Sequence, residues 1–282
     1  MAEEDAPLLE FKNVSLSFGQ ITALRNISLT LKPGETRILF GAAGSGKTTL
    51  LKAVIGLVPV DEGEIRLFGE DVTSKDEHDL YPLRSRSGVL FQEGGLFDSL
   101  TIGENVEYPL LNRQADDDGE QEVIPPEEID KRVRDALRFV ELEHTIDQFP
   151  SQVSGGMRRR VGIARAIVTE PPLVLYDSPT AGLDPITANT IMALIAKERE
   201  TRNSASLIVT HRYQDGELMA NFRYDSDRGG LEPIDGAGEN GRSDGRTRFI
   251  VMKEGEIVFF GTREELESSG DEYVKQFVRR EG

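Results

Sequence analysis

Residues 36–54 read TRILFGAAGSGKTTLLKAV and combine a short apolar run, a glycine-rich loop and the start of a helix. The loop from Gly41 to Thr48 fits the pattern G-x-x-x-x-G-K-[ST] in the strand–loop–helix context that this motif requires. Glycines let backbone N–H groups turn inward around an anion, and the positive end of the helix adds to that attraction. The segment therefore predicts a loop that binds the phosphates of a nucleoside triphosphate.

Within this loop we expect Lys47 to bridge the β- and γ-phosphates and the Thr48 hydroxyl to hold Mg²⁺. A glycine-rich turn with a surface lysine is the alternative, which the flanking strand and helix disfavour. The residues expected to bind the nucleotide are Gly41, Ala42, Ala43, Gly44, Ser45, Gly46, Lys47, Thr48 and Thr49.

The composition restricts the partners and the compartment. The 282 residues include 33 Lys and Arg against 50 Asp and Glu, and the net charge of −17 disfavours binding to nucleic acid. The chain has no cysteine, which excludes a disulfide scaffold, a thiolate metal site and a cysteine nucleophile. No signal peptide and no run of 18 apolar residues are visible. We therefore expect a cytoplasmic chain that reaches a membrane only through other subunits.

Outside the loop, short β-rich runs alternate with helical patterns. Apolar residues at Ile129, Val133, Leu137 and Val140 have helical spacing, and further helices are expected after Ser154 and Pro185. This alternation predicts an α/β fold with a mainly parallel sheet. The predicted strands are Leu8–Val14, Ile27–Leu31, Thr36–Phe40, Ser87–Phe91, Leu173–Tyr176 and Ser206–Thr210.

Composition shifts divide the chain into parts. Residues 94–165 are mostly helical in pattern and are expected to form an inserted subdomain. The acidic run from 116 to 122 reads as a solvated loop, because it has too few apolar residues to offset its ordering entropy. The stretch 223–247, rich in Gly, Asp and Ser, is predicted to be a flexible insertion, with a partner- or lipid-facing loop as the alternative. Residues 262–282 are expected to form a helical tail.

Five further motifs follow in a fixed order. Gln92 and His211 each close a predicted strand, Leu173–Asp177 is an apolar strand that ends in a carboxylate, and VSGGM at 153–157 precedes AGLDP at 181–185. In this order and spacing the chain closely resembles the ATP-binding subunit of ABC transporters over nearly its whole length. The resemblance implies one nucleotide-binding domain, 1–282: a P-loop NTPase (RecA-like) core with an antiparallel β subdomain and an inserted α-helical subdomain.

The resemblance also implies roles by position. Asp177 would orient Mg²⁺ through water, together with Thr48, and Gln92 would link the metal and the γ-phosphate to the helical subdomain. His211 would contact the γ-phosphate. Phe18 stands where these proteins place an aromatic ring on adenine, although it is equally compatible with a core residue.

In the same family, the signature residues cap ATP that is bound to the opposite subunit of a head-to-tail dimer. By the same resemblance, Asp184 would cross that interface. The implied partner is a second copy of the chain or a homologous ATPase subunit, with two shared ATP sites. The signature residues are Ser154, Gly155 and Gly156.

Ser178 departs from the family, which carries a catalytic glutamate at this position. A serine hydroxyl is a poor proton acceptor, and the loss of a general base costs roughly 10²–10⁴ in rate. Slow hydrolysis, with Gln92 and His211 placing the water or with help from Glu93, is one reading. A largely non-hydrolytic regulatory clamp is the other. Met157 in place of glutamine and Arg212 in place of aspartate are smaller departures.

The segment that follows Gln92 resembles the Mce/Mla type, whose ATPases energise lipid traffic across the envelope of diderm bacteria. The residues that carry this resemblance are the FQ-x-G-x-LFDSL run at 91–100, the NV-x-x-PL run that ends at Leu110, and the SGGM signature. The resemblance implies a groove for a coupling helix of an integral-membrane permease, a position on the inner face of the cell membrane, and a substrate-binding lipid carrier as a further partner. Alternatively, Leu96, Phe97, Val106 and Leu110 are ordinary core residues.

Two other ATPase classes fit poorly. A chromosome-maintenance ATPase needs a long heptad coiled coil between the phosphate loop and the signature, and here only about 105 residues separate them. A translation-factor ABC protein usually carries two cassettes, whereas this chain has one phosphate loop and one signature.

Overall fold

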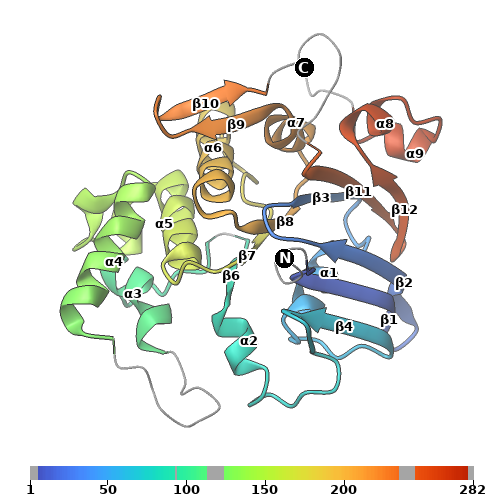
Figure 1. Cartoon of the computed structure of the whole chain (residues 1–282), viewed down its shortest axis with the longest axis horizontal. Helices are drawn as coiled ribbons and strands as arrows, with labels where there is room; N and C mark the ends of the chain where they lie inside the picture. Colours follow the sequence, from blue (N-terminus) through green and yellow to red (C-terminus); the bar gives the residue numbers. More distant parts are fainter. Residues whose placement is uncertain (1–5, 93, 113–123, 235–244, 279–282) are drawn as a thin grey trace.

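The strand that carries the phosphate loop lies inside a six-stranded sheet (Figure 1). β3 (Thr36–Gly41) pairs in parallel with β11 (Thr247–Lys253) on one side and with β8 (Ala205–Val209) on the other. The remaining strands, in sheet order, are β12 (Glu256–Gly261) at the antiparallel edge and β7 (Leu173–Asp177) and β6 (Ser87–Leu90) beyond β8. The computed structural model describes residues 6–92, 94–112, 124–234 and 245–278.

Both faces of this sheet are covered, which explains why its central strands read as continuous apolar runs. Every residue of β3 and of β7 is buried. Side chains alternate between two cores along β3, so that Ile38 and Phe40 belong to one core and Leu39 to the other. The burial places the phosphate loop at the end of a rigid strand.

A four-stranded antiparallel sheet packs with α1 (Lys47–Val54) against one face of the large sheet. Its two long strands lie beside each other in the register Leu9 to Leu31. Each of them alternates buried and exposed side chains over much of its length, as expected for a sheet with one solvated face. The strands, in sheet order, are β2 (Ile21–Leu31), β1 (Leu9–Phe18), β4 (Glu62–Leu67) and β5 (Glu70–Asp71).

Three helices pack together on the opposite side of the molecule, at the left of Figure 1. α3 (Ile102–Leu111) begins with a capping box between Thr101 and Glu104. α4 (Pro126–Phe139) starts with proline and acidic residues in its first turn. α5 (Gly155–Ile167) is capped by Ser154. Their buried faces join the core that also contains Ile38 and Phe40.

The second half of the chain adds α6 (Pro185–Arg202), α7 (Tyr213–Asn221) and an antiparallel hairpin of β9 (Phe222–Asp225) and β10 (Gly230–Pro233). The hairpin covers the first part of the stretch 223–247, for which we expect a flexible insertion, and that expectation stays a prediction. Leu231 packs on the main core and β9 lies against α6, contacts that polar composition does not reveal. Residues 235–244 and the acidic run at 116–122 lie outside the described residues.

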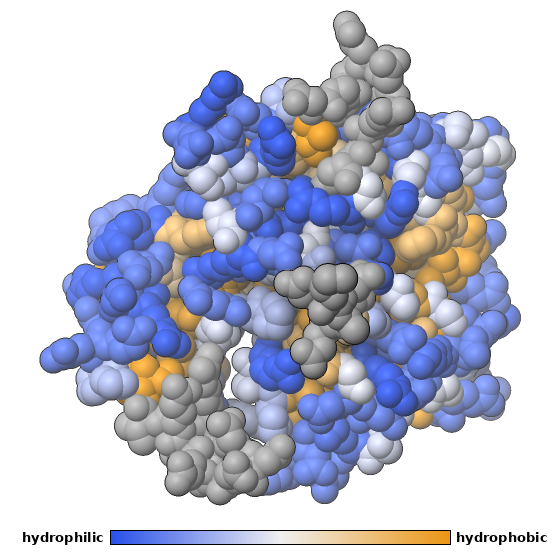
Figure 2. All heavy atoms as spheres, viewed as in Figure 1, coloured by the Kyte–Doolittle hydropathy of each residue, from blue (hydrophilic) through white to orange (hydrophobic). Residues whose placement is uncertain are grey.

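The architecture confirms the predicted fold class of an α/β core with an antiparallel β subdomain and an inserted helical subdomain. Within the described part of the chain, every helix is too short or too polar to span a membrane. Figure 2 shows a largely hydrophilic face, with hydrophobic residues gathered at the right, where Figure 1 places β12. The remaining elements are α2 (Tyr81–Ser85), η1 (Glu143–Thr145), η2 (Pro150–Gln152), α8 (Arg263–Glu267) and α9 (Glu272–Lys275).

Candidate nucleotide-binding site

The phosphate loop needs glycine at two crowded positions. A Cβ atom on Gly41 would lie 2.4 Å from Ser45 Oγ and 2.5 Å from the carbonyl oxygen of Met252. Gly46 has φ +101°, and its Cβ would lie 2.3 Å from the carbonyl oxygen of Ala23. No other residue type fits either position, so the loop closes tightly around the start of α1.

Lys47 points into this loop. Its Nζ donates to the carbonyl oxygens of Gly41 and Ala42, at 2.8 Å each, and to Ser45 Oγ at 3.2 Å. Burial lowers the pKa of Lys47, and the nearby charge of Asp177 opposes that shift. The ammonium group is therefore held where the phosphates of a nucleotide would enter.

Thr48 and Asp177 meet across the sheet. Thr48 Oγ1, in the first turn of α1, donates to Asp177 Oδ2 at 3.1 Å, although β8 separates their two strands. A hydroxyl and a carboxylate are oxygen ligands of the kind that Mg²⁺ prefers. The pair fits a magnesium ion beside the phosphate loop.

One cavity brings together the residues that the motifs single out as catalytic. It has a volume of about 370 Å³ and lies between the loop, the end of β7 and the end of β8. Phe18 and Ile21 stand at its rim, and Phe18 is 52% exposed, so that its ring is free to stack on a base. The residues that line it are Phe18, Ile21, Thr22, Ala23, residues 43–49, Gln92, Asp177, Ser178, Ala181, Val209 and His211.

His211 lies at the end of β8 on the wall of this cavity. Burial lowers the pKa of His211, and the charge of Lys47 lowers it further, against the opposing effect of Asp177. This lowering favours the neutral form of the imidazole. A neutral ring offers one donor and one acceptor to a phosphate or a water molecule.

Ser178 has a strained and buried position. Its φ is +53°, its N–H donates to the carbonyl oxygen of Val209 at 2.9 Å, and its Oγ donates to Asp177 Oδ1 at 3.1 Å. The hydroxyl proton is thus directed at Asp177 while the lone pairs of Oγ stay available. A neutral hydroxyl can accept a hydrogen bond from water but is a weak base. Glu93 lies outside the described residues.

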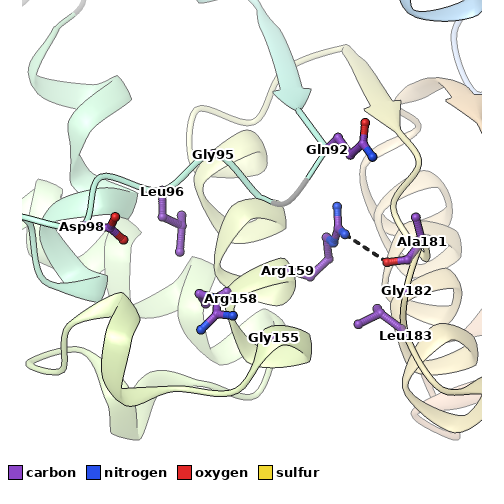
Figure 3. Close-up of a pocket in the computed structure, with 10 residues that line it drawn as sticks. All are labelled: Gln92, Gly95, Leu96, Asp98, Gly155, Arg158, Arg159, Ala181, Gly182 and Leu183. Carbon is purple, nitrogen blue, oxygen red and sulfur yellow. Dashed lines mark hydrogen bonds between the residues drawn. The ribbon is translucent and has the colours of Figure 1, made fainter.

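The signature residues lie elsewhere. Ser154 caps α5 by accepting from Met157 N at 3.2 Å, and a Cβ on Gly156 would lie 2.7 Å from Thr187 Cγ2. Gly155 lines a different cavity, of about 540 Å³, between α5 and the segment 181–183 (Figure 3). The structure therefore does not bring Ser154, Gly155 and Gly156 to the phosphate loop of their own chain.

Gln92 lines both cavities, so it connects the phosphate loop with the helical subdomain. In the second cavity, Figure 3 shows Arg159 of α5 reaching the segment 181–183, where it donates to the carbonyl oxygen of Ala181 at 3.2 Å. Asp184 follows that segment and caps α6 through Ile186 N and Thr187 N, at 3.0 Å each. A hydrogen bond from the Thr187 hydroxyl is the main cause that lowers the pKa of the Asp184 carboxyl, and the two backbone N–H groups lower it further.

Asp215 was not anticipated from the sequence. It is buried in the first turn of α7, and its Oδ2 accepts from Thr180 Oγ1 at 2.5 Å and from Thr210 Oγ1 at 2.6 Å. Burial raises the pKa of Asp215. Arg212, which replaces the usual aspartate, places Nη1 3.6 Å from Asp215 Oδ1. The only sign of this acid in the sequence was Arg212, an unusual residue for its position, three residues before Asp215.

Comparison with known proteins agrees with this geometry. Residues 24–181 match the family described as ABC transporter. The chain is similar to the intermembrane phospholipid transport system ATP-binding protein MlaF of Haemophilus influenzae, with 31% identity over 97% of this chain and 91% of that protein. The MlaF protein of Escherichia coli K12 is 30% identical over 99% of this chain and 91% of its own length.

Among solved structures, a dimeric post-hydrolysis ATP-binding cassette, MJ0796, bound to ADP and Pi matches with a TM-score of 0.71 and 32% identity. The match covers 90% of this chain and 98% of that one. The family match, the full-length relatives and this fold agree with one another. The chain belongs to the ABC transporter family and is an ATP-binding subunit of the ABC ATPase type.

Proposed function

We propose that this subunit binds MgATP in the 370 Å³ cavity, with Thr48 and Asp177 as the oxygens that hold the metal. The observation that carries the proposal is the 3.1 Å contact between Thr48 Oγ1 and Asp177 Oδ2 beside the buried Lys47 ammonium. Bound magnesium would neutralise phosphate charge there. Backbone N–H groups of residues 43–49 would bind the phosphates, and Phe18 would stack on the adenine ring.

The closed form is a head-to-tail dimer in which Ser154, Gly155 and Gly156 cap the ATP of the other subunit. This proposal is supported by the absence of all three from the cavity at their own phosphate loop, within the described residues. The first turn of α5 contains no acidic side chain, so its N–H groups can attract phosphate oxygens. Asp184 would lie at the same interface, because it caps α6 beside Thr187, which Gly156 approaches closely.

Hydrolysis would be slow, because Ser178 supplies no strong base. We propose that Gln92 and the neutral His211 hold the attacking water against the γ-phosphate. These two residues would position the water but would not accept its proton. General-base catalysis, which contributes roughly 10²–10⁴ to the rate, would therefore be missing. The regulatory clamp without turnover is not favoured, since the chain belongs to a family of ATPases and its cavity brings Lys47, Asp177 and His211 together.

A membrane permease docks against the helical side of the molecule. Phe97, Tyr108 and Leu111 are each at least 42% exposed there, and the rings of Phe97 and Tyr108 lie 4.8 Å apart. Tyr108 also lines a hollow of about 260 Å³ between α2, β6, α3 and α5. Exposed apolar side chains beside a hollow suit the insertion of an amphipathic helix. We therefore assign this hollow and its apolar rim to the coupling helix of the permease.

The substrate is proposed to be a phospholipid or related lipid. This proposal is supported by the similarity to MlaF proteins over nearly the full chain, since those proteins belong to a phospholipid transport system. The subunit would then lie on the inner face of the cell membrane, attached through its permease. A substrate-binding lipid carrier would be a further partner of the assembled transporter.

The test uses the ATPase co-purified with its permease in lipid vesicles. Asp177→Asn should weaken magnesium-dependent ATP binding at least tenfold, whereas Asp225→Asn on the hairpin should not. Phe97→Ser should release the permease during purification while ATP binding is kept. Phe260→Ser removes a similarly exposed ring from β12 and is the matched control. ATP binding that survives Asp177→Asn, or permease retention in Phe97→Ser, would contradict the corresponding assignment.

A further inference from the structure

The last helices of the described chain reach back to the phosphate loop. α8 begins at a capping box formed by Thr262 and Glu265, and Asp271 caps α9 by accepting from Tyr273 N and Val274 N. These caps fix two short helices that follow β12 directly. Val274 is fully buried, so α9 is anchored in the main core.

Tyr273 connects the loop with the neighbouring strand. The N–H of Ala42 donates to the Tyr273 hydroxyl at 3.2 Å, and that hydroxyl donates to the carbonyl oxygen of Met252 at 3.1 Å. Met252 belongs to β11 and is the register partner of Gly41, the first residue of the loop. One phenol group therefore bridges two segments that are separated by more than two hundred residues.

Packing holds the Tyr273 ring in place. The ring meets Phe277 edge-on at 5.3 Å between centroids, and Lys253 Nζ lies 5.0 Å from its centre. Phe277 in turn stacks on Phe40, the residue before the loop, at 6.2 Å. Because the ring is fixed on both sides, its hydroxyl stays within reach of the loop without a large further loss of side-chain entropy.

Ala42 is held from two directions. Its N–H is bound to Tyr273, and its carbonyl oxygen accepts from Lys47 Nζ at 2.8 Å. Ala42 is exposed, and it begins the turn that presents the next N–H groups to phosphate. The orientation of its peptide groups therefore influences both the loop and the Lys47 ammonium.

We propose that Tyr273 is a positioning residue for the phosphate loop, through which the C-terminal helices set the affinity of the site for ATP. Tyr273 does not line the 370 Å³ cavity; it preorganises the loop that does. The inference rests on nucleotide binding at this loop, which titration of the unmodified chain with MgATP establishes independently. Loss of one such hydrogen bond should weaken ATP binding by about three- to tenfold.

The test compares hydroxyl loss with ring loss in the full chain. Tyr273→Phe keeps the contacts with Phe277 and Lys253, whereas Tyr273→Leu removes them as well. Isothermal titration with MgATP gives the Kd, which is suitable because the chain has no tryptophan for intrinsic fluorescence. Steady-state phosphate release gives kcat and KM separately. Tyr224→Phe removes a phenol hydroxyl from the hairpin, away from the loop, and is the matched control.

We expect both Tyr273 variants to raise Kd and KM for ATP by about three- to tenfold with kcat unchanged within twofold, because the bound nucleotide itself orders the loop. Tyr224→Phe should match the unmodified chain. The proposal is overturned if Tyr273→Phe binds ATP normally while Tyr273→Leu does not, since packing alone would then explain the effect. It is also overturned if kcat falls without a change in Kd.

Discussion

Thr180 and Thr210 lie on separate loops, yet their hydroxyls donate to the same oxygen of Asp215, at 2.5 and 2.6 Å. Thr180 stands between Asp177 and Asp184, and Thr210 directly precedes His211. The buried carboxylate therefore ties the loop that follows the metal-binding strand to the loop that presents the histidine. Movement of one loop away from the other breaks a hydrogen bond to a buried acid.

This tie predicts different outcomes for two substitutions of Asp215. Asp215→Ala removes both hydrogen bonds and should lower the free energy of unfolding by about 2–4 kcal/mol and kcat by about tenfold. Asp215→Asn keeps an oxygen that can accept from both hydroxyls, so its kcat should stay within about threefold of normal. Urea unfolding and phosphate release measure the two quantities. Equal activity of Asp215→Ala and the unmodified chain, at equal folded fraction, would show that the tie is unimportant.

Restoring a carboxylate at position 178 should accelerate turnover. Ser178 lines the nucleotide cavity, so Ser178→Glu would place a base where water can be activated, and the ATPase rate should rise by about 10²-fold. Ser178→Ala loses only the hydrogen bond to Asp177 and should leave the rate within a few-fold of normal. Phosphate release with excess MgATP measures both. An unchanged or lower rate in Ser178→Glu would mean that another residue already acts as the base.

Dimer closure can be separated from helix stability at Ser154. Ser154→Ala should cost about 1 kcal/mol through loss of the α5 cap and should also abolish MgATP-dependent dimerisation. Thr101→Ala removes a comparable cap from α3 and should reduce stability without affecting dimerisation. Light scattering with MgATP detects the dimer, which slow hydrolysis should preserve. A normal ATP-dependent dimer in Ser154→Ala would falsify the cross-subunit assignment.

Glu198 predicts a pH dependence of stability. It is fully buried in α6, and burial raises its pKa to about 7, with Arg202 at 3.3 Å opposing the shift. Between its ordinary pKa and this raised pKa, the folded chain keeps a proton on Glu198 that the unfolded chain releases. Glu198 therefore contributes its full stabilisation below about pH 4.5, the ordinary pKa of a glutamate. That stabilisation is lost as the pH rises to about 7.

Glu198→Gln removes this titration. The unfolding free energy of the unmodified chain, minus that of the variant, should fall by up to about 3 kcal/mol between pH 4.5 and 8. Urea unfolding at several pH values measures that difference. Glu127→Gln, on the exposed face of α4, is the control for the loss of a glutamate side chain. If the difference in unfolding free energy between the unmodified chain and Glu198→Gln does not change with pH, Glu198 has its ordinary pKa in the folded chain.

The parts of the fold that local sequence determines were predictable. The run from Thr36 to Val54 carries its strand, loop and helix within nineteen residues, and the apolar spacing of α4 shows directly which side is buried. The family resemblance singled out Gln92, Asp177 and His211, which stand at the ends of parallel strands, and their roles in catalysis stay predictions. Such ends meet at one edge of the sheet, as the cavity confirms.

The contacts of Asp215 and Tyr273 were not predictable in this way. Asp215 reads as an ordinary acid in a first turn of a helix, and only the fold brings Thr180 to it. Tyr273 meets Ala42 across the full length of the chain, and no periodic pattern encodes that contact. The contact between β9 and α6 was not predictable for a similar reason, because no local pattern links these two segments.

The sheet order has a consequence for biosynthesis. β3, made early, acquires its second neighbour only when β11 leaves the ribosome, more than two hundred residues later. Until then β3 has an unpaired edge, and the loop at its end lacks both Met252 and Tyr273. The ribosome therefore synthesises all of the motifs expected to contact the nucleotide before the chain can form the finished ATP pocket.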